Sequence, residues 1–143
     1  MSLGVLVDAS VAVKWYVTEP DSATAERLLS RDVVLHAPTL LMTELANALW
    51  KNFRRDIIDR GQAQDALAGL RRTIAHWHDE EDYLPDALDL ALRLDHPVYD
   101  LLYLALAERI GTVCVTADQR LVRRTRSTPF AGRVVHLADW RAA

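Results

Sequence analysis

Two short apolar segments of this chain are each followed by an aspartate. Residues 5–7 lead directly to Asp8, and residues 113–115 come shortly before Asp118. Short runs rich in β-branched residues that alternate with helical patterns predict a mainly parallel sheet covered on both faces. Ligands of such sheets bind beyond the carboxyl ends of the strands. We therefore expect an α/β fold in which Asp8 and Asp118 lie at the same end of a central sheet.

Hydrophobic periodicity gives the remaining elements. It predicts strands at 4–8, 33–36, 112–116 and 133–136. Helices are expected at 10–16, from Asp21 to about 30, from Pro38 to about 55, from Asp59 through Trp77, and then at 85–94, 98–110 and 118–126. Asp21 and Asp59 are expected to cap their helices, Pro38 to occupy a first turn, and Gly111 to end the helix at 98–110.

Two further acids lie where the chain is otherwise apolar. Glu44 is three residues after Leu41 and four before Ala48, so it lies at the edge of the stripe that faces the core. Asp100 opens a helix that is apolar on nearly all sides. Acidic side chains are rarely buried unless they are paired or bound to a metal. Because both helices can reach the end of the sheet, Glu44 and Asp100 are expected to meet Asp8 and Asp118 in one pocket.

Four neighbouring carboxylates would repel one another unless cations neutralised them. Hard oxygen ligands without cysteine or a convincing histidine set favour Mg²⁺ or Mn²⁺ over zinc. One or two such ions can activate water for phosphodiester hydrolysis. Asp8, Glu44, Asp100 and Asp118 are therefore candidate metal ligands and catalytic residues. Ser10 and Thr116 are either supporting polar groups of this site or helix caps.

Length and charge narrow the choice of function. A chain of 143 residues suits a single domain over 1–143, and its net charge of −3 argues against a simple electrostatic nucleic-acid binder. The part from Arg109 onward, however, holds seven arginines and two aspartates. Arg120, Arg123 and Arg124 follow Asp118 closely and are candidates for contacts to RNA phosphates. No apolar stretch could span a bilayer, the start lacks a signal-peptide pattern, and Cys114 stands alone, which together suggest the cytoplasm.

Several other residues are assigned structural roles. His76 and His78 are two apart, which on a helix would place their rings on different faces, so a zinc site is not expected. His96 stands at a helix junction, and the helical pairs Arg54-Arg55 and Arg71-Arg72 are expected to face solvent. A tryptophan is usually a core or interface residue. Packing rather than stacking on RNA bases is accordingly expected for Trp15, Trp50 and Trp140.

Four segments together resemble a known family. They are VDAS at 7–10, TELANA at 43–48, HPVYDLLYLA at 96–105 and TADQRL at 116–121. In this order and spacing they resemble the PIN-domain toxins of the VapC type, over essentially the whole chain. The resemblance implies a PIN-like three-layer α/β/α fold forming a single PIN domain. It places the family's acidic positions at Asp8, Glu44, Asp100 and Asp118, and its polar positions at Ser10 and Thr116.

The same resemblance implies an activity and partners. The expected activity is that of a Mg²⁺- or Mn²⁺-dependent endoribonuclease, the toxin of a type II toxin–antitoxin pair. The expected partners are an RNA substrate, a VapB-like antitoxin that covers the acidic pocket and inserts a basic side chain, and a second copy in a homodimer. The sequence does not encode which RNA is cut, because RNA specificity depends on shape and on single-stranded loops.

Two alternatives remain open on the sequence alone. One is a phosphoacceptor or phosphatase domain with Asp8 as nucleophile, which would also need a lysine at a later strand end. The only lysines, Lys14 and Lys51, both fall in helical segments. The other is a PIN-like module that has kept the pocket for partner binding alone. Trapping of a phospho-aspartate would favour the first, and a lack of divalent-ion binding would favour the second.

Overall fold

The computed structural model describes residues 3–142 and contains a central sheet of five parallel strands. The predicted domain limits, 1 and 143, lie outside these described residues. The order across the sheet is β3-β2-β1-β4-β5, so the first strand in the sequence is the central one. The strands are β1 (Leu3–Val7), β2 (Val33–Pro38), β3 (His76–His78), β4 (Val113–Thr116) and β5 (Val134–His136).

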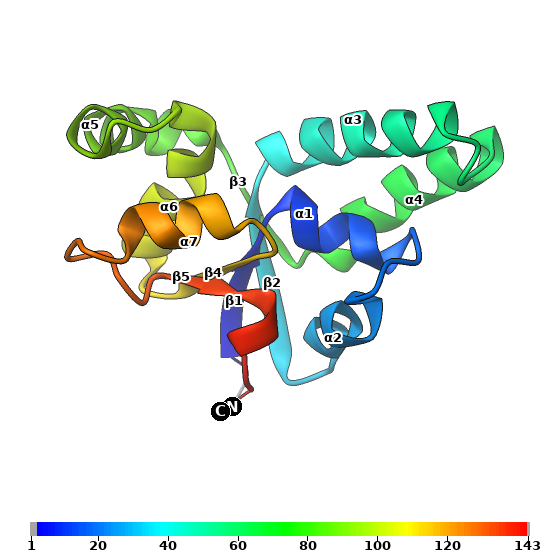
Figure 1. Ribbon diagram of the computed structural model, residues 1–143, viewed down its shortest axis with the longest axis horizontal. Coiled ribbons are helices and arrows are strands. Elements are labelled where there is room, and N and C mark those ends of the chain that lie inside the picture. Colours follow the sequence, from blue (N-terminus) through cyan, green and yellow to red (C-terminus); the bar gives the residue numbers. More distant parts are fainter. Residues whose placement is uncertain (1–2, 143) are drawn as a thin grey trace.

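Helices cover both faces of the sheet, which confirms the predicted three-layer α/β/α fold. In Figure 1, α5, α6 and α7 lie on one side of the strands, and α1 to α4 lie on the other. The α-helices are α1 (Ala9–Ala12), α2 (Ser22–Glu26), α3 (Leu40–Arg54), α4 (Arg60–Thr73), α5 (Leu84–Leu94), α6 (Val98–Ile110) and α7 (Gln119–Thr125). Short 3-10 turns occupy Val13–Trp15, Arg27–Leu29, Glu80–Asp82 and Leu137–Asp139.

The alternation of side chains along β1 creates two separate cores. Val5 and Val7 point toward the side of α1, α3 and α4, where Leu41, Leu45 and other apolar residues pack. Leu6 points the other way, into the core that contains α5 and α6. Helix α6 is the centre of this second core, since residues 101–107 are all buried.

The helix ends follow local sequence signals. Asp59 caps α4 with a capping box, in which its side chain accepts from the backbone N–H of Gln62 at 2.7 Å and the Gln62 amide oxygen accepts from the backbone N–H of Asp59 at 2.8 Å. Gly111 ends α6 with a φ of 71°, in the left-handed region that glycine adopts without strain. Both predicted ends are confirmed. Asp21 occupies the N-cap position of α2, but its side chain makes no capping hydrogen bond.

Two predicted boundaries are wrong. Pro38 ends strand β2 rather than opening a helix, and α3 begins at Leu40. Trp77 does not continue α4, which ends at Thr73; it lies instead in β3, whose residues pair with 36–38 of β2. In a strand, residues two apart share a face. His76 and His78 therefore lie on the same side, where both rings stack on His36.

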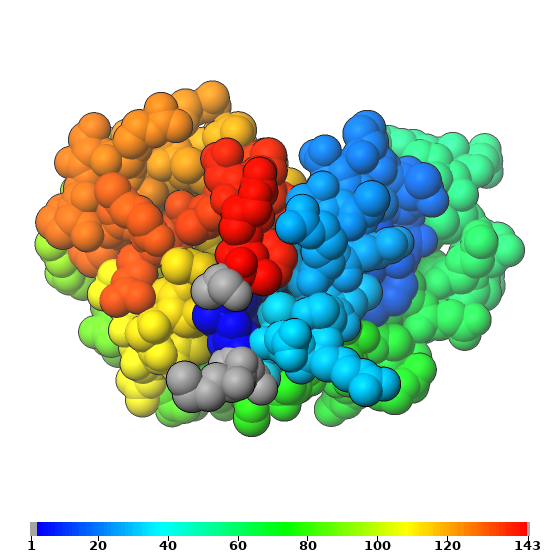
Figure 2. Space-filling view, turned by 90° about the horizontal axis from the view of Figure 1, so that it is seen from below, coloured from blue at the N-terminus to red at the C-terminus, as the bar shows by residue number. Residues whose placement is uncertain are grey.

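After β5, the chain runs back toward the end of the sheet at which β1 begins. Viewed from below, Figure 2 shows the C-terminal segment beside the helical segment that contains α2. Trp140 is 4% exposed and belongs to the same core as Ala25 of α2, so this segment closes the lower end of that core. Among the described residues, no helix is long and apolar enough to cross a membrane.

Candidate active site

Four carboxylates from four separate elements line one cavity of about 390 Å³ at the carboxyl edge of the sheet. Asp8 follows β1 and caps α1, and Asp118 follows β4 and caps α7. Because β1 and β4 are neighbouring parallel strands, these two aspartates lie side by side at the end of the sheet. Asp100 comes from the first turn of α6, and Glu44 from the second turn of α3. The cavity therefore opens between the two helical layers.

Asp8 is held in place by two hydroxyl groups. Ser10 donates to its Oδ1 at 2.5 Å, and Thr116 donates to its Oδ2. The backbone N–H of Val11 adds a 3.3 Å bond to Oδ1. Burial raises the pKa of Asp8 from 3.8 to about 6, and the charge of Asp100 adds to this effect, while the hydrogen bonds oppose it. An ionised Asp8 is thus costly here unless a cation approaches.

Glu44 receives a hydrogen bond from the phenol of Tyr103 at 2.5 Å. Tyr103 belongs to α6 and is 2% exposed, so it fixes the glutamate from the opposite helical layer. Burial raises the pKa of Glu44 above its ordinary value, and the charges of Asp8 and Asp100 raise it further. Four carboxylates line the cavity against two basic side chains, Lys51 and Arg120, so negative charge is in excess there.

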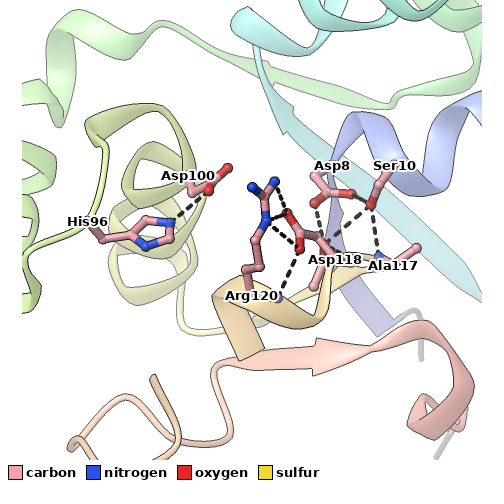
Figure 3. A network of polar contacts seen from close by, with 8 residues as sticks. Asp8, Ser10, His96, Asp100, Ala117, Asp118 and Arg120 are labelled. Atoms are coloured by element: carbon pink, nitrogen blue, oxygen red, sulfur yellow. Dashed lines mark hydrogen bonds and ion pairs between the residues drawn. The ribbon is translucent and has the colours of Figure 1, made fainter. Parts of the chain in front are cut away.

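The other two acids are turned toward basic side chains (Figure 3). The guanidinium of Arg120 donates to both oxygens of Asp118, at 3.0 Å from Nη2 and at 3.2 and 3.3 Å from Nε. These bonds lower the pKa of Asp118 below its ordinary value. The Nε2 atom of His96, four residues earlier in the chain, lies 2.8 Å from Oδ2 of Asp100. The sequence suggested only a structural role for His96, and this contact shows that it positions an acid of the cavity.

The donor set of the cavity fits a hard divalent cation. Within the described part of the chain, its lining supplies carboxylate and hydroxyl oxygens but neither histidine nor cysteine. Among residues 3–142, no group of three His, Cys, Asp or Glu side chains is arranged to hold a single metal ion. Asp100 and Asp118 are instead engaged by His96 and Arg120, respectively. The four acids share one cavity without forming a complete coordination shell.

Three polar residues of the cavity were missed by sequence reasoning: Asn47, Lys51 and Tyr103. Asn47 and Lys51 line it together with Glu44. They follow Glu44 by three and seven residues, so helical spacing places all three on one face of α3. That spacing was a usable signal. Tyr103 follows Asp100 by three residues in the same way, but its role also depends on how α6 faces α3.

The three candidate arginines differ in position. Arg120 lines the cavity, with a side chain that is 79% exposed. Arg124 is exposed and donates to the backbone carbonyl of Asp95 at 2.8 Å. Arg123 is exposed on α7 and is not part of the cavity lining. Ser10 and Thr116 are both oriented toward Asp8, so they support the acid rather than cap a helix.

Comparison with known proteins places this site in a family. The PIN domain model matches residues 5–126, a range that contains all four acids. The chain is therefore a PIN-domain protein. Ribonuclease VapC3 of Pyrobaculum aerophilum is 38% identical over 121 residues, which cover 83% of this chain and 92% of the relative. Ribonuclease VapC1 of Mycobacterium tuberculosis is 32% identical over 81% of this chain and 86% of the relative. Within the PIN-domain proteins, the chain belongs to the VapC ribonucleases.

Solved structures show the same fold. The crystal structure of PAE2754 from Pyrobaculum aerophilum has a TM-score of 0.73 at 24% identity and covers 96% of this chain and 92% of its own. Mycobacterium tuberculosis VapC20, described as a sarcin–ricin loop cleaving toxin, gives a TM-score of 0.64 at 20% identity, with coverage of 80% and 89%. VapBC2 from Rickettsia felis, bound to a promoter DNA fragment, gives 0.66 at 13% identity, with coverage of 97% and 100%. Because the chain belongs to the VapC ribonucleases, the interpretation as a phosphoacceptor domain is not retained.

Proposed function

We propose that this protein is an endoribonuclease that acts as the toxin of a VapBC-type pair and cleaves RNA with divalent ions held by Asp8, Glu44, Asp100 and Asp118. The observation that carries the proposal is the single cavity of about 390 Å³ that receives these carboxylates from four elements. Burial that raises the pKa of Asp8 to about 6 supports it, because a cation would relieve the cost of the buried charge.

The oxygen-only donor set favours Mg²⁺ or Mn²⁺, as one or two ions. When bound, such an ion supplies Lewis acidity that polarises a phosphate and makes a nearby water more acidic. Asp8 is the anchor, because Ser10 and Thr116 already fix both of its oxygens. Glu44 is fixed by Tyr103, while Asp100 and Asp118 would exchange His96 and Arg120 for the incoming cation.

The basic groups near the cavity would handle the RNA phosphate. Arg120 lies over Asp118, and release of that carboxylate to a cation would free its guanidinium for a phosphate oxygen. Lys51 faces the same cavity from α3. Arg123 and Arg124 on the exposed side of α7 remain candidates for contacts farther along the strand. Among residues 3–142, none of the residues that line the cavity is a histidine, so no histidine is assigned as a base.

The proposed protein partner is a VapB-like antitoxin. The cavity contains two carboxylates whose pKa values are raised, which makes it a favourable receptor for a basic side chain of a peptide. A homodimer is the second proposed assembly. Leu84, Leu88 and Leu92 follow one another at four-residue spacing on α5 and are 44%, 53% and 75% exposed. This stripe is an apolar surface that a second copy would cover.

The test is Mg²⁺-dependent cleavage of total RNA by the purified protein, with mapping of the new ends. Asp8→Asn and Asp100→Asn are expected to abolish cleavage. Asp65→Asn, at an exposed position of α4, serves as the matched control and should retain it. Undiminished cleavage by both Asp8→Asn and Asp100→Asn would overturn the assignment of the site.

A further inference from the structure

Helix α3 leads directly out of the cavity toward a second hollow. Lys51 lines the cavity and also lines this second hollow of about 350 Å³, whose other lining residues are Trp50, Arg54 and Arg55. We call Trp50, Lys51, Arg54 and Arg55 the α3 patch. The two hollows share Lys51, so a chain-like ligand that enters the cavity can continue onto the patch without leaving the protein surface.

The positive charges of the patch are available to a ligand. Lys51, Arg54 and Arg55 are all exposed, and within residues 3–142 none of them forms an ion pair. In contrast, Lys14, the other lysine of the chain, is paired with Glu19 at 2.7 Å. Basic residues at the end of a helix also complement its dipole. That effect explains a positive charge there but does not explain an exposed tryptophan among the charges.

Trp50 differs from the other tryptophans in its exposure. It is 50% exposed and so is not a core residue, whereas Trp140 is 4% exposed. Trp15 packs against the core and donates from its indole to the backbone carbonyl of Ala25 at 2.8 Å. Trp77 is partly buried in the sheet. The guanidinium of Arg54 lies 5.2 Å from the centre of the Trp50 ring, so the aromatic surface and the charge are presented together.

We propose that the α3 patch binds the single-stranded RNA that flanks the scissile phosphate, with Trp50 stacking on a base and Lys51, Arg54 and Arg55 contacting successive phosphates. This inference rests on the proposed function. Cationic grooves with aromatic stacking residues are the usual means of holding single-stranded nucleic acid. At ~1.5 Å per helical residue, Arg55 lies about 16 Å along α3 from Glu44. That length corresponds to roughly five nucleotides of a stacked strand at ~3.4 Å each.

Charge favours RNA over the antitoxin as the occupant of the patch. The cavity is acidic and suits a basic side chain, but the α3 patch carries three cations and suits a polyanion. A phosphodiester strand therefore gains attraction along its whole path outside the cavity. A peptide that places basic residues in the cavity would gain nothing from the positive patch beside it.

The experiment compares Arg54→Ala/Arg55→Ala with Arg71→Ala/Arg72→Ala. The second pair is a matched control, because it is an exposed arginine pair in the last turn of the neighbouring helix α4. The patch variant should raise KM for a single-stranded RNA roughly tenfold, with kcat changed less than about twofold. The slope of log binding constant against log salt should fall by about 0.7 for each lost phosphate contact, hence by about 1.4. The control should match the wild-type protein in both readouts.

Two further measurements keep the inference separable from the proposed function. Trp50→Phe should remove most of the quenching of tryptophan fluorescence that RNA binding causes. Binding of a short labelled single-stranded RNA is measured in an Asp8→Asn background, so the patch is tested without any need for cleavage. If the wild-type protein cleaves no RNA, that result overturns the proposed function alone. Unchanged KM, salt slope and quenching in the patch variants would overturn the inference. Loss of antitoxin affinity without loss of RNA affinity would overturn it too, because the patch would then belong to the antitoxin interface.

Discussion

The phenol of Tyr103 and the carboxylate of Glu44 lie 2.5 Å apart, although α6 and α3 cover opposite faces of the sheet. This hydrogen bond is a direct connection between the two helical layers at the mouth of the cavity. It leaves Glu44 with a fixed orientation and one oxygen free for a ligand. Tyr103 is therefore a positioning residue whose effect should be seen through Glu44.

Tyr103→Phe tests this role. The variant keeps the buried ring but removes the donor, so Glu44 should lose its orientation while the core stays packed. Groups that orient metal ligands typically contribute 10–100-fold to metal affinity or activity. We expect the concentration of Mn²⁺ needed for half-maximal cleavage to rise by about tenfold, with little change in Tm. An unchanged metal requirement would remove Tyr103 from the site.

Asp8→Asn is expected to stabilise the metal-free protein. The folded-state pKa of Asp8 is raised from 3.8 to about 6, so its favourable contribution is complete below pH 3.8 and is lost as the pH rises through 6. Replacement by the neutral amide removes that pH-dependent loss. The variant should therefore exceed the wild-type protein in unfolding free energy by about 1–3 kcal/mol above pH 6, with a difference that shrinks toward pH 3.8.

Divalent ions should reverse this order. Saturating Mn²⁺ should raise the Tm of the wild-type protein by mass action and leave Asp8→Asn nearly unchanged. The measurement is thermal unfolding across pH, with and without the ion, and Asp65→Asn as control. A stability difference that does not vary with pH would contradict the account of Asp8.

Arg120→Ala should separate metal binding from cleavage. Arg120 competes with any cation for Asp118, and its hydrogen bonds hold the pKa of Asp118 below the ordinary value. Its removal should tighten Mn²⁺ binding severalfold, as measured by calorimetry, and raise the pKa of Asp118. Cleavage should nevertheless slow by about tenfold or more, because the guanidinium no longer meets the phosphate. Weaker Mn²⁺ binding together with unchanged cleavage in Arg120→Ala would contradict both proposed roles of Arg120.

Leu88→Lys tests the proposed homodimer. Leu88 is the middle residue of the exposed stripe on α5 and is 53% exposed, so a charge there should not disturb the monomer. Light scattering should show a mass near twice 16.1 kDa for the wild-type protein and near 16.1 kDa for the variant. Ile57→Lys, at a 54% exposed position remote from α5, is the control and should leave the mass unchanged. A monomeric wild-type protein would refute the dimer.

Sequence patterns predicted the frame of the site because its anchors are local. Asp8 directly follows β1, and Asp118 comes two residues after the end of β4. Because β1 and β4 are parallel neighbours, the two aspartates are brought together. Glu44 could be placed by its position on the edge of an apolar stripe. For these three residues, periodicity and strand ends were sufficient. Asp100 could be placed because its helix is apolar on nearly all sides, a pattern that marked α6 as the central helix of its layer.

Other features depend on contacts that are distant in the sequence. Strand β3 has three residues, too few for a periodic signal, and it exists because residues 76–78 pair with β2. The bond of Tyr103 to Glu44 depends on the way α6 faces α3 across the cavity. Arg120 was predicted only as a candidate for phosphate contacts, and its hydrogen bonds to Asp118 could not be foreseen from the sequence.

The most direct test of the account is a crystal structure of the protein grown with Mn²⁺, with the ions located by anomalous scattering. We predict one or two peaks inside the cavity, with Asp8 as a ligand and with Asp118 released from Arg120. A fully occupied Mn²⁺ site elsewhere on the protein, with the cavity empty and the Asp118–Arg120 pair intact, would contradict the central claim.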